Sequence, residues 1–452
     1  LTDASGTVSG VIADGGVAGG ASGNLTLQGG TETLTGVNTY TGGTDISAGT
    51  LALAGSGSIA SSDQLLMENG SVFDISGTSA GASVTSVADS DGTIALGGKT
   101  LTIGAGTSNV EPREMVFAGG ATGNLVNEIF GQVVDGGISG GVGGGLTLTN
   151  PDPSGSIVAT LLVGQNTYTG ATTIEAGTAL ILVSGSAFGM TDDASQPTSI
   201  ASSSRVVDNG ILDISVNGTL TSSDADASGS VDDTAPTMST ASTAITSLAG
   251  NGIVSLGSQN LLLTNASDTF SGTITDDGIF KEETGVQAGA TGGSVTLAGG
   301  HETLTGVNTY TGGTTIEAGT LTGTTASFGS GAIVDNGTLD IDQSADGTLA
   351  NAVSGTGMLL KDGTGTLSIS QAETYTGATT INAGALTLSG DGSIATSSAV
   401  TVNGGTFDIS GTTDGTSIAS LSGATGGAVS LGGKTLSLTD AAGSFAGSIA
   451  GT

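Results

Sequence analysis

The chain has 452 residues, including 83 glycines, no cysteine and no tryptophan, and its 40 acidic and 6 basic residues give a formal net charge of −34. The lack of cysteine excludes a disulfide scaffold and a thiolate metal site, and the few scattered basic residues exclude nucleic acid and anionic membrane surfaces as main partners. Because only 3% of the residues are aromatic, any core must be thin and built from Leu, Ile, Val and Ala.

Disorder is the first alternative for a chain so rich in Gly, Ser and Thr. Charged residues make up only 10% of the chain, mean hydropathy is +0.25 and proline occurs 5 times, whereas disordered segments are usually richer in charge and proline. We therefore expect a folded chain. No run of about 18 apolar residues is present, so no helical membrane span is predicted.

In chain order, the first long segment is TDASGTVSGVIADGG from Thr2, and a tyrosine motif follows at 38–51. An FDIS strand comes next, from Ser71, and then an LGGKTL segment that contains Lys99. This order of segments returns along the chain, and the opening phase itself recurs from Thr264 and Thr439. Internal repetition on this scale is typical of an array of stacked units.

We predict one continuous repeat array over residues 1–452 that starts and stops in mid-pattern, as expected of a piece of a longer protein. The tandem modules are predicted at about 1–100, 101–262 and 263–436, with the start of a further module at 437–452. Two stretches depart from the repeat and are predicted to be loop insertions, at about 104–145 and 221–240. Such departures from a repeat are where binding determinants are usually found.

The tyrosine motif is the most regular feature of the sequence. It reads NTYTGGTDISAGTL at 38–51 and returns at 166–180, 308–321 and 373–386. Every tyrosine of the chain lies in it, and each is followed two residues later by glycine. We predict that these eight residues are structural: Tyr40, Tyr168, Tyr310, Tyr375, Gly42, Gly170, Gly312 and Gly377.

Apolar residues alternate with Thr and Ser at a period of two throughout the modules, as in Leu51/Leu53 and Phe407/Ile409. Strands of three to five residues between turn residues are predicted, with almost no helix. A barrel or propeller must close on a fixed number of units, whereas a solenoid need not. Coils of about 20–25 residues predict an all-β solenoid of roughly 20 rungs, in which each coil covers the apolar interior of the next.

At the tyrosine motif the sequence resembles the autotransporter-associated β-strand repeat, also called the passenger-associated transport repeat. Ala171 and Ala378 replace the second glycine of that pattern, and Glu373 replaces its asparagine. The resemblance implies a right-handed parallel β-helix from the passenger domain of a Gram-negative autotransporter. It also implies a secreted or cell-surface location with tethering to the outer membrane, and it names no catalytic residue.

Catalytic and metal chemistry find little support in the sequence. His301 is the only histidine and replaces Thr31 in a nearly identical copy, which indicates surface variation. The adjacent carboxylates are Asp192 and Asp193, Asp232 and Asp233, and Asp276 and Asp277. We interpret them as turn residues, predict no catalytic, cofactor or metal residue, and leave open only a weak structural calcium ion at the acidic stretch 221–233.

The sequence thus predicts a structural or adhesive element, a rigid extracellular stalk or fibre that displays binding loops and is not an enzyme. The expected partners are molecules of a host-cell or neighbouring-cell surface, extracellular matrix or polysaccharide. The alternative is a self-assembling extracellular filament or matrix protein, whose partner would be further copies of itself. A polysaccharide-degrading β-helix enzyme is the third hypothesis, because glycoside hydrolysis needs only two suitably spaced carboxylates.

Overall fold

The structure is a computed structural model of the chain. It describes residues 1–68, 70–104, 113–116, 122–151, 156–184, 198–217, 220–221, 237–238, 241–278 and 291–451. All regular structure in these residues is β-strand, and no helix occurs among them. In the same residues, no helix is long and apolar enough to cross a membrane.

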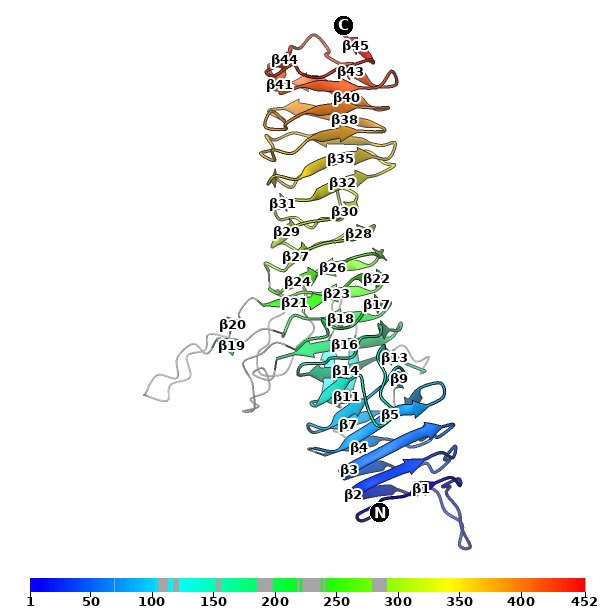
Figure 1. The fold of residues 1–452 in the computed structure, drawn as a ribbon. Helices are drawn as coiled ribbons and strands as arrows, with labels where there is room; N and C mark the ends of the chain where they lie inside the picture. Colours follow the sequence, from blue (N-terminus) through cyan, green and yellow to red (C-terminus); the bar gives the residue numbers. More distant parts are fainter. Residues whose placement is uncertain are drawn as a thin grey trace, which may run out of the picture. The chain divides into compact units, whose positions relative to one another are not determined.

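The chain divides into two compact units. Unit 1 comprises Leu1–Asn260 and Asp276–Ala290, and unit 2 comprises Leu261–Thr275 and Thr291–Thr452. Each unit is a parallel β-solenoid whose strands pair in register with those of the next coil (Figure 1). The described coils make about 17 turns, close to the roughly 20 that the sequence predicts. The β-solenoid fold is therefore confirmed, while its right-handedness stays a prediction.

Unit 1 contains two long parallel sheets. One includes, in order of pairing, β12 (Gln132–Val134), β8 (Thr93–Ala95), β5 (Val72–Thr78), β3 (Thr44–Gly55), β4 (Leu65–Met67), β7 (Val87–Asp89), β11 (Thr122–Ile129), β14 (Ile157–Val163), β16 (Thr178–Val183), β18 (Ile211–Asp213) and β23 (Ile253–Ser255), with β2 (Leu25–Leu34) and β1 (Thr7–Val8) joined through β3. The other includes β6 (Ala82–Val84), β9 (Thr100–Ile103), β13 (Gly145–Leu148), β15 (Thr172–Ile174), β17 (Val206–Asp208) and β22 (Leu248–Gly250).

Two short pairs in unit 1 are antiparallel. They are β10 (Arg113–Val116) with β11, and β19 (Leu220–Thr221) with β20 (Thr237–Met238). The first falls within the predicted insertion 104–145, and the second lies at the predicted insertion 221–240 and begins one residue before it. In the first of these stretches β11, β12 and β13 also pair in parallel with coils of the solenoid. Most of the second stretch, including the acidic residues 222–233, lies outside the described residues.

Unit 2 contains three long runs of parallel strands. The first is β25 (Thr269–Phe270), β28 (His301–Leu304), β30 (Thr320–Gly323), β32 (Thr338–Asp342), β35 (Met358–Asp362), β37 (Thr379–Ile381), β39 (Val400–Val402) and β42 (Leu421–Gly423). The second is β27 (Ser294–Leu297), β29 (Gly313–Ile316), β31 (Ile333–Asp335) and β34 (Val353–Ser354). The third is β33 (Gly347–Thr348), β36 (Thr366–Ile369), β38 (Ala385–Gly390), β40 (Thr406–Thr412), β43 (Ala428–Ser430) and β45 (Ser448–Ala450).

Three further strands and one further strand pair complete the described set. They are β21 (Ser242–Ile245), β24 (Asn260–Leu263), β26 (Thr273–Thr275) and the pair β41 (Thr416–Ile418) with β44 (Leu436–Leu438).

The core of each unit is a set of in-register ladders. In unit 2 the inward residues of successive coils are Leu321, Leu339, Leu359, Thr379, Val400 and Leu421. Each side chain packs on its counterpart one coil away, as the period-two pattern predicts. Five of these six residues are apolar, and the exception, Thr379, belongs to a tyrosine motif.

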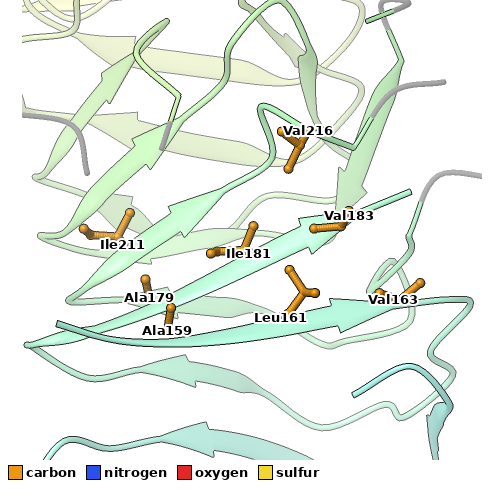
Figure 2. Close-up of a cluster of buried hydrophobic side chains, with 8 residues drawn as sticks. All are labelled: Ala159, Leu161, Val163, Ala179, Ile181, Val183, Ile211 and Val216. Carbon is orange, nitrogen blue, oxygen red and sulfur yellow. The ribbon is translucent and has the colours of Figure 1, made fainter. Parts of the chain in front are cut away.

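Unit 1 also has one apolar cluster that the repeat does not predict. It runs across β14, β16 and β18 and consists of Ala159, Leu161, Val163, Ala179, Ile181, Val183, Ile211 and Val216 (Figure 2). Every residue of β16 is buried, so in this part of the solenoid both faces of the strand are covered. Burial on both faces stabilises this region by about 25 cal/mol for each Å² of apolar surface removed from water.

Candidate functional site

A threonine inside the apolar ladder explains the tyrosine motif. Thr44, Thr172, Thr314 and Thr379 each occupy an inward ladder position with an apolar residue on the adjoining coils. A buried hydroxyl without a partner costs about 1–3 kcal/mol. The tyrosine four residues earlier supplies the partner. Its hydroxyl lies 2.6 Å from the threonine Oγ1 in the first three copies and 2.7 Å in the fourth.

A second residue type extends the contact in three copies. Thr44, Thr172 and Thr379 contact the hydroxyls of Ser62, Ser203 and Ser397 at 2.9–3.0 Å. Each serine in turn donates to the carbonyl of the motif glycine, Gly42, Gly170 or Gly377. The sequence reasoning missed these serines, although the segments SIASS, SIASS and SIATS that contain them repeat visibly.

The third copy lacks this serine. Thr314 Oγ1 donates to the carbonyl of Phe328 at 3.0 Å, where the sequence reads SFGSG. The threonine is still fully partnered, so the tyrosine contact does not depend on the serine. The tyrosine and the threonine are therefore the constant pair of the motif.

Burial fixes the charge state of the four phenols. Tyr168, Tyr310 and Tyr375 are at most 1% exposed, and burial raises the pKa of each hydroxyl well above its ordinary value. Burial also raises the pKa of Tyr40. The phenols are therefore neutral at physiological pH. Because each hydroxyl is already hydrogen-bonded to a threonine, the tyrosines act as packing groups.

The motif glycines are required by the adjacent coil. A Cβ on Gly170 would lie 2.4 Å from the carbonyl oxygen of Gly143, and one on Gly312 would lie 2.1 Å from that of Gly292. The corresponding distance at Gly377 is 1.8 Å, to the oxygen of Gly357. At Gly42 the nearest atom is Asn24 Oδ1, at 2.2 Å. Close approach of the adjacent coil therefore explains the glycine in all four copies.

The asparagine that opens the motif joins three coils. Asn38 Oδ1 accepts the backbone N–H of Ile12 at 2.9 Å, and its Nδ2 donates to the carbonyls of Gly36 and Ser58. Asn166 and Asn308 accept from Val133 and Ile274 in the same way. In the fourth copy Glu373 Oε2 accepts from Val353, but Oε1 is buried without a hydrogen-bond partner. Burial raises the pKa of Glu373.

A carboxylate caps the motif in unit 1. Asp14 accepts hydrogen bonds from the N–H groups of Ser22, Gly23 and Thr41 and from the Thr41 hydroxyl. Asp135 accepts from Gly143, Gly144 and Thr169 in the same arrangement. These hydrogen bonds lower the pKa of Asp14. The sequence reasoning missed both residues, although ADGG and VDGG repeat at equivalent places.

A comparison with protein families agrees with this geometry. The family described as Passenger-associated-transport-repeat matches residues 22–53, 159–178, 292–322 and 359–388. The chain carries four autotransporter passenger repeats. Each match overlaps one copy of the tyrosine motif, which confirms the predicted resemblance. Searches of curated proteins and of solved structures found no significant match.

The passenger repeat is characteristic of secreted or cell-surface proteins of Gram-negative bacteria, and the chain is placed among them on that basis. In each passenger repeat the tyrosine, the threonine, the glycine and the opening Asn or Glu are all engaged with the chain itself. The repeat therefore explains how the coils are held together and leaves none of these groups available for a ligand.

His301 connects two coils next to the third passenger repeat. Its Nε2 lies 2.9 Å from Thr322 Oγ1, which donates to Asp340 Oδ2 at 3.0 Å. The imidazole itself is exposed on β28, as expected for surface variation. Burial raises the pKa of Asp340 to about 6. The three residues lie on the neighbouring strands β28, β30 and β32. The Thr322 hydroxyl is hydrogen-bonded to both of the other side chains.

Lys361 is a buried cation that the sequence reasoning missed. It occupies an inward ladder position between Ile341 and Ile381 and is 0% exposed. Its ammonium donates to the carbonyls of Asp362, Gly363 and Ala383. Burial lowers the pKa of Lys361. Lys99 and Lys434, which stand in the LGGKTL segments, are only half-buried and donate to the carbonyls of Ser79 and Thr413.

The remaining acidic candidates are not brought together into a site. Asp192, Asp193, Asp232 and Asp233 lie outside the described residues, as does most of the stretch proposed for calcium. Asp276 is buried, and both it and Asp277 are engaged in interactions. Within the described part of the chain, no group of three or more His, Asp or Glu residues could hold a metal ion.

Replacing Tyr168 with phenylalanine tests the buried pair. The change leaves the ring in place but removes the hydroxyl contact with Thr172, so we expect unit 1 to lose about 1 kcal/mol of stability. Urea unfolding followed by circular dichroism measures this loss. The double variant that also carries Thr172→Val should recover part of it, because the buried threonine hydroxyl that has lost its tyrosine partner is then removed. If the single variant is as stable as the wild type, the pair is not structural.

Replacing Glu373 with glutamine is expected to stabilise unit 2. The amide keeps an oxygen for the Val353 N–H and removes a buried charge, as asparagine does in the other three passenger repeats. We expect a gain of about 1 kcal/mol at pH 8, read from the urea midpoint. The gain should shrink as the pH falls through the raised pKa of the folded carboxyl and should be gone below the ordinary pKa of glutamate, where the carboxyl is neutral in the unfolded chain as well. A destabilised variant at pH 8 would contradict this account.

Proposed function

We propose that the chain is a non-catalytic structural and adhesive segment of an autotransporter-type protein at the bacterial surface, tethered to the outer membrane. The solenoid acts as a rigid extracellular stalk, and segments that depart from the repeat display the binding determinants. Its partners are molecules of a host-cell or neighbouring-cell surface, extracellular matrix or polysaccharide.

One observation carries the proposal, namely that the buried polar groups repeated in the motif are hydrogen-bonded within the solenoid. The four tyrosines, the threonine four residues after each of them, the serines that contact three of these threonines and the opening asparagines of the first three copies are buried and hydrogen-bonded within the chain. An enzyme instead keeps a few polar groups poised toward a substrate. In the described coils, the repeated buried polar groups therefore serve to hold the solenoid together.

The surface charge supports an extracellular stalk. A net charge of −34 keeps the protein soluble and limits nonspecific association. Parallel coils that are hydrogen-bonded in register resist bending, because bending would break many backbone hydrogen bonds at once. A stiff acidic stalk holds its displayed segments away from the negatively charged cell envelope.

Adhesion is tested by fusing the chain to a membrane-tethered carrier protein and displaying the fusion on a bacterium that lacks adhesins. Cells carrying it should bind host cells, matrix or polysaccharide more than cells carrying a variant without residues 221–240; the stretch 104–145 contains strands of the solenoid and is left in place. Equal binding by the two would place the determinants on the coils instead. No binding above cells without the chain would exclude adhesion.

The two other hypotheses give different results with the purified chain. A self-assembling filament would show concentration-dependent growth in light scattering and long fibres in negative-stain images. A polysaccharide-degrading enzyme would release reducing ends from acidic or neutral polysaccharides. Particles of constant size and no turnover are expected from a stalk.

A further inference from the structure

An Asp–Asn–Gly turn in unit 2 brings together the groups needed to convert an asparagine. Asp335 ends β31, and its Oδ1 accepts the backbone N–H of Gly337 at 2.9 Å. The intervening Asn336 is exposed, and its side-chain oxygen points to the next coil. There Oδ1 accepts two hydrogen bonds from Thr356, one from the backbone N–H at 3.2 Å and one from the hydroxyl at 3.1 Å.

We propose that this turn is a self-modification site, at which Asp335 and Thr356 promote cyclisation of Asn336 onto the nitrogen of Gly337 and so convert the asparagine to aspartate or isoaspartate.

The three contacts match the three requirements of the reaction. The nucleophile is the Gly337 nitrogen, and its proton is already directed at a carboxylate that can accept it. The electrophile is Asn336 Cγ, and negative charge develops on its Oδ1 as the bond forms. Two donors from Thr356 already point at that oxygen, in the manner of an oxyanion hole. Glycine at the third position leaves the nitrogen unhindered.

The step balances without an external oxidant or reductant. Asp335 takes the amide proton of Gly337, and the nitrogen bonds to Asn336 Cγ. The tetrahedral intermediate then collapses, the bond from Cγ to Nδ2 breaks, and the proton passes from Asp335 to the departing nitrogen, which leaves as ammonia. Water subsequently opens the succinimide at either carbonyl. The net change is an amide and water converted to a carboxylic acid and ammonia.

The environment of Asp335 suits a base. Its carboxyl is 1% exposed, and Oδ2 is buried with no hydrogen-bond partner. Burial raises the pKa of Asp335 to about 6. A carboxylate that is ionised at neutral pH yet more basic than an ordinary aspartate is the better proton acceptor. The same contact recurs in unit 1, where Asp208 Oδ1 accepts the N–H of Gly210 across Asn209 at 3.1 Å.

The chain contains a natural control in unit 2. Asn403 is also exposed and also precedes a glycine, and its backbone N–H donates to Ile381 just as that of Asn336 donates to Ile316. The residue before Asn403 is Val402, which has no carboxylate. The Asn403 amide Nδ2 donates to Asn382 Oδ1 at 2.9 Å. The two asparagines thus differ in the groups that the proposal invokes.

The test follows both asparagines in the intact folded chain during incubation at neutral pH in ¹⁸O-labelled water. Peptide mass spectrometry gives the deamidated fraction at each site, and an isoaspartate assay identifies the product. Asn336 should react roughly 10- to 100-fold faster than Asn403, since a positioned general base contributes about 100-fold or more. The difference should vanish in denaturant, where both sequences are free peptides.

Two variants separate the roles of the neighbours. Asp335→Asn keeps an oxygen for the Gly337 N–H but removes the base, so Asn336 should slow to the rate of Asn403. Thr356→Ala, at an exposed position, removes one of the two donors and should slow Asn336 by a smaller factor. Equal rates at Asn336 and Asn403 in the folded wild type would overturn the proposal. If Asp335→Asn does not fold, an unchanged rate in Thr356→Ala would overturn it equally.

Discussion

Replacing Gly170 with alanine is expected to lower the stability of unit 1 by about 3 kcal/mol or more, near the upper end of the usual cost of overpacking. The added Cβ would lie 2.4 Å from the carbonyl oxygen of Gly143 and 2.6 Å from that of Gly144. Both obstacles are backbone atoms, so no side-chain rotation relieves the clash. The coils would have to separate, which would also weaken the hydrogen bond from Gly170 N–H to Gly144 at 2.7 Å.

Gly20→Ala is the matched control in the same unit. A Cβ at Gly20 would meet no atom within 4 Å, and the residue is exposed. Its backbone is not in the left-handed region, so alanine is tolerated there without strain. Urea unfolding should therefore leave this variant within about 0.5 kcal/mol of the wild type. Similar losses in the two variants would show that close approach is not the reason for glycine in the passenger repeat.

Repetition allowed the fold to be predicted from the sequence. A period-two pattern within segments of about 20 residues fixes which side chains point inward, and stacking of equal segments fixes the register. Residues such as Leu339 and Leu386 therefore occupy the ladder positions that the alternation predicts. The antiparallel pair of β10 and β11 lies where the repeat breaks off, so no pattern was available to predict it.

The inner contacts of the passenger repeat were only partly predictable. The tyrosines and glycines were identified because they recur, but the sequence does not say which buried group a phenol will meet. Thr172 is conspicuous only once its place in the apolar ladder is known, because threonine also fills the outward positions of the strands. Ser203 is 31 residues from Thr172 along the chain, and only the coil geometry brings the two together.

Lys361 and Asp335 show why buried charges escape prediction. Each lies at an inward position near the end of a short strand, and its residue type alone resembles the solvated charges found elsewhere in the repeat. Their burial depends on how the backbone turns at the end of the strand and on the coil that follows. For Lys361 the deciding feature is a set of three carbonyls, which leave no trace in the side-chain sequence.

The second large effect is expected at Asp208, where the stability of unit 1 should fall as the pH rises. Asp208 is 0% exposed, and its Oδ2 has no hydrogen-bond partner. Burial raises the pKa of Asp208 from 3.8 to about 8, against the smaller opposing effect of backbone hydrogen bonds from Gly210 and Leu212. Between these two values the folded chain holds a proton that the unfolded chain releases.

The sign follows from linkage, because stability falls with pH wherever the folded state binds more protons. The contribution of Asp208 is fully present below about pH 4 and is lost progressively up to about pH 8. From pH 5 to pH 8 the loss is on the order of 4 kcal/mol. Hydrogen exchange of the amides in β15, β17 and β22 reports it locally, and urea midpoints report it for the unit.

Asp208→Asn is expected to remove most of this dependence and to be more stable than the wild type at pH 8, because asparagine keeps an acceptor for Gly210 without a buried charge.

Asp14→Asn in the same unit is expected to change the stability in the opposite direction. The hydrogen bonds that lower the pKa of Asp14 favour its ionised form, so this variant should lose stability above the ordinary aspartate pKa and not below it. If wild-type stability instead rose from pH 5 to pH 8 and Asp208→Asn left that rise unchanged, Asp208 would have to be ionised in the folded chain. A hydrogen-bond donor to Oδ2 would then be required.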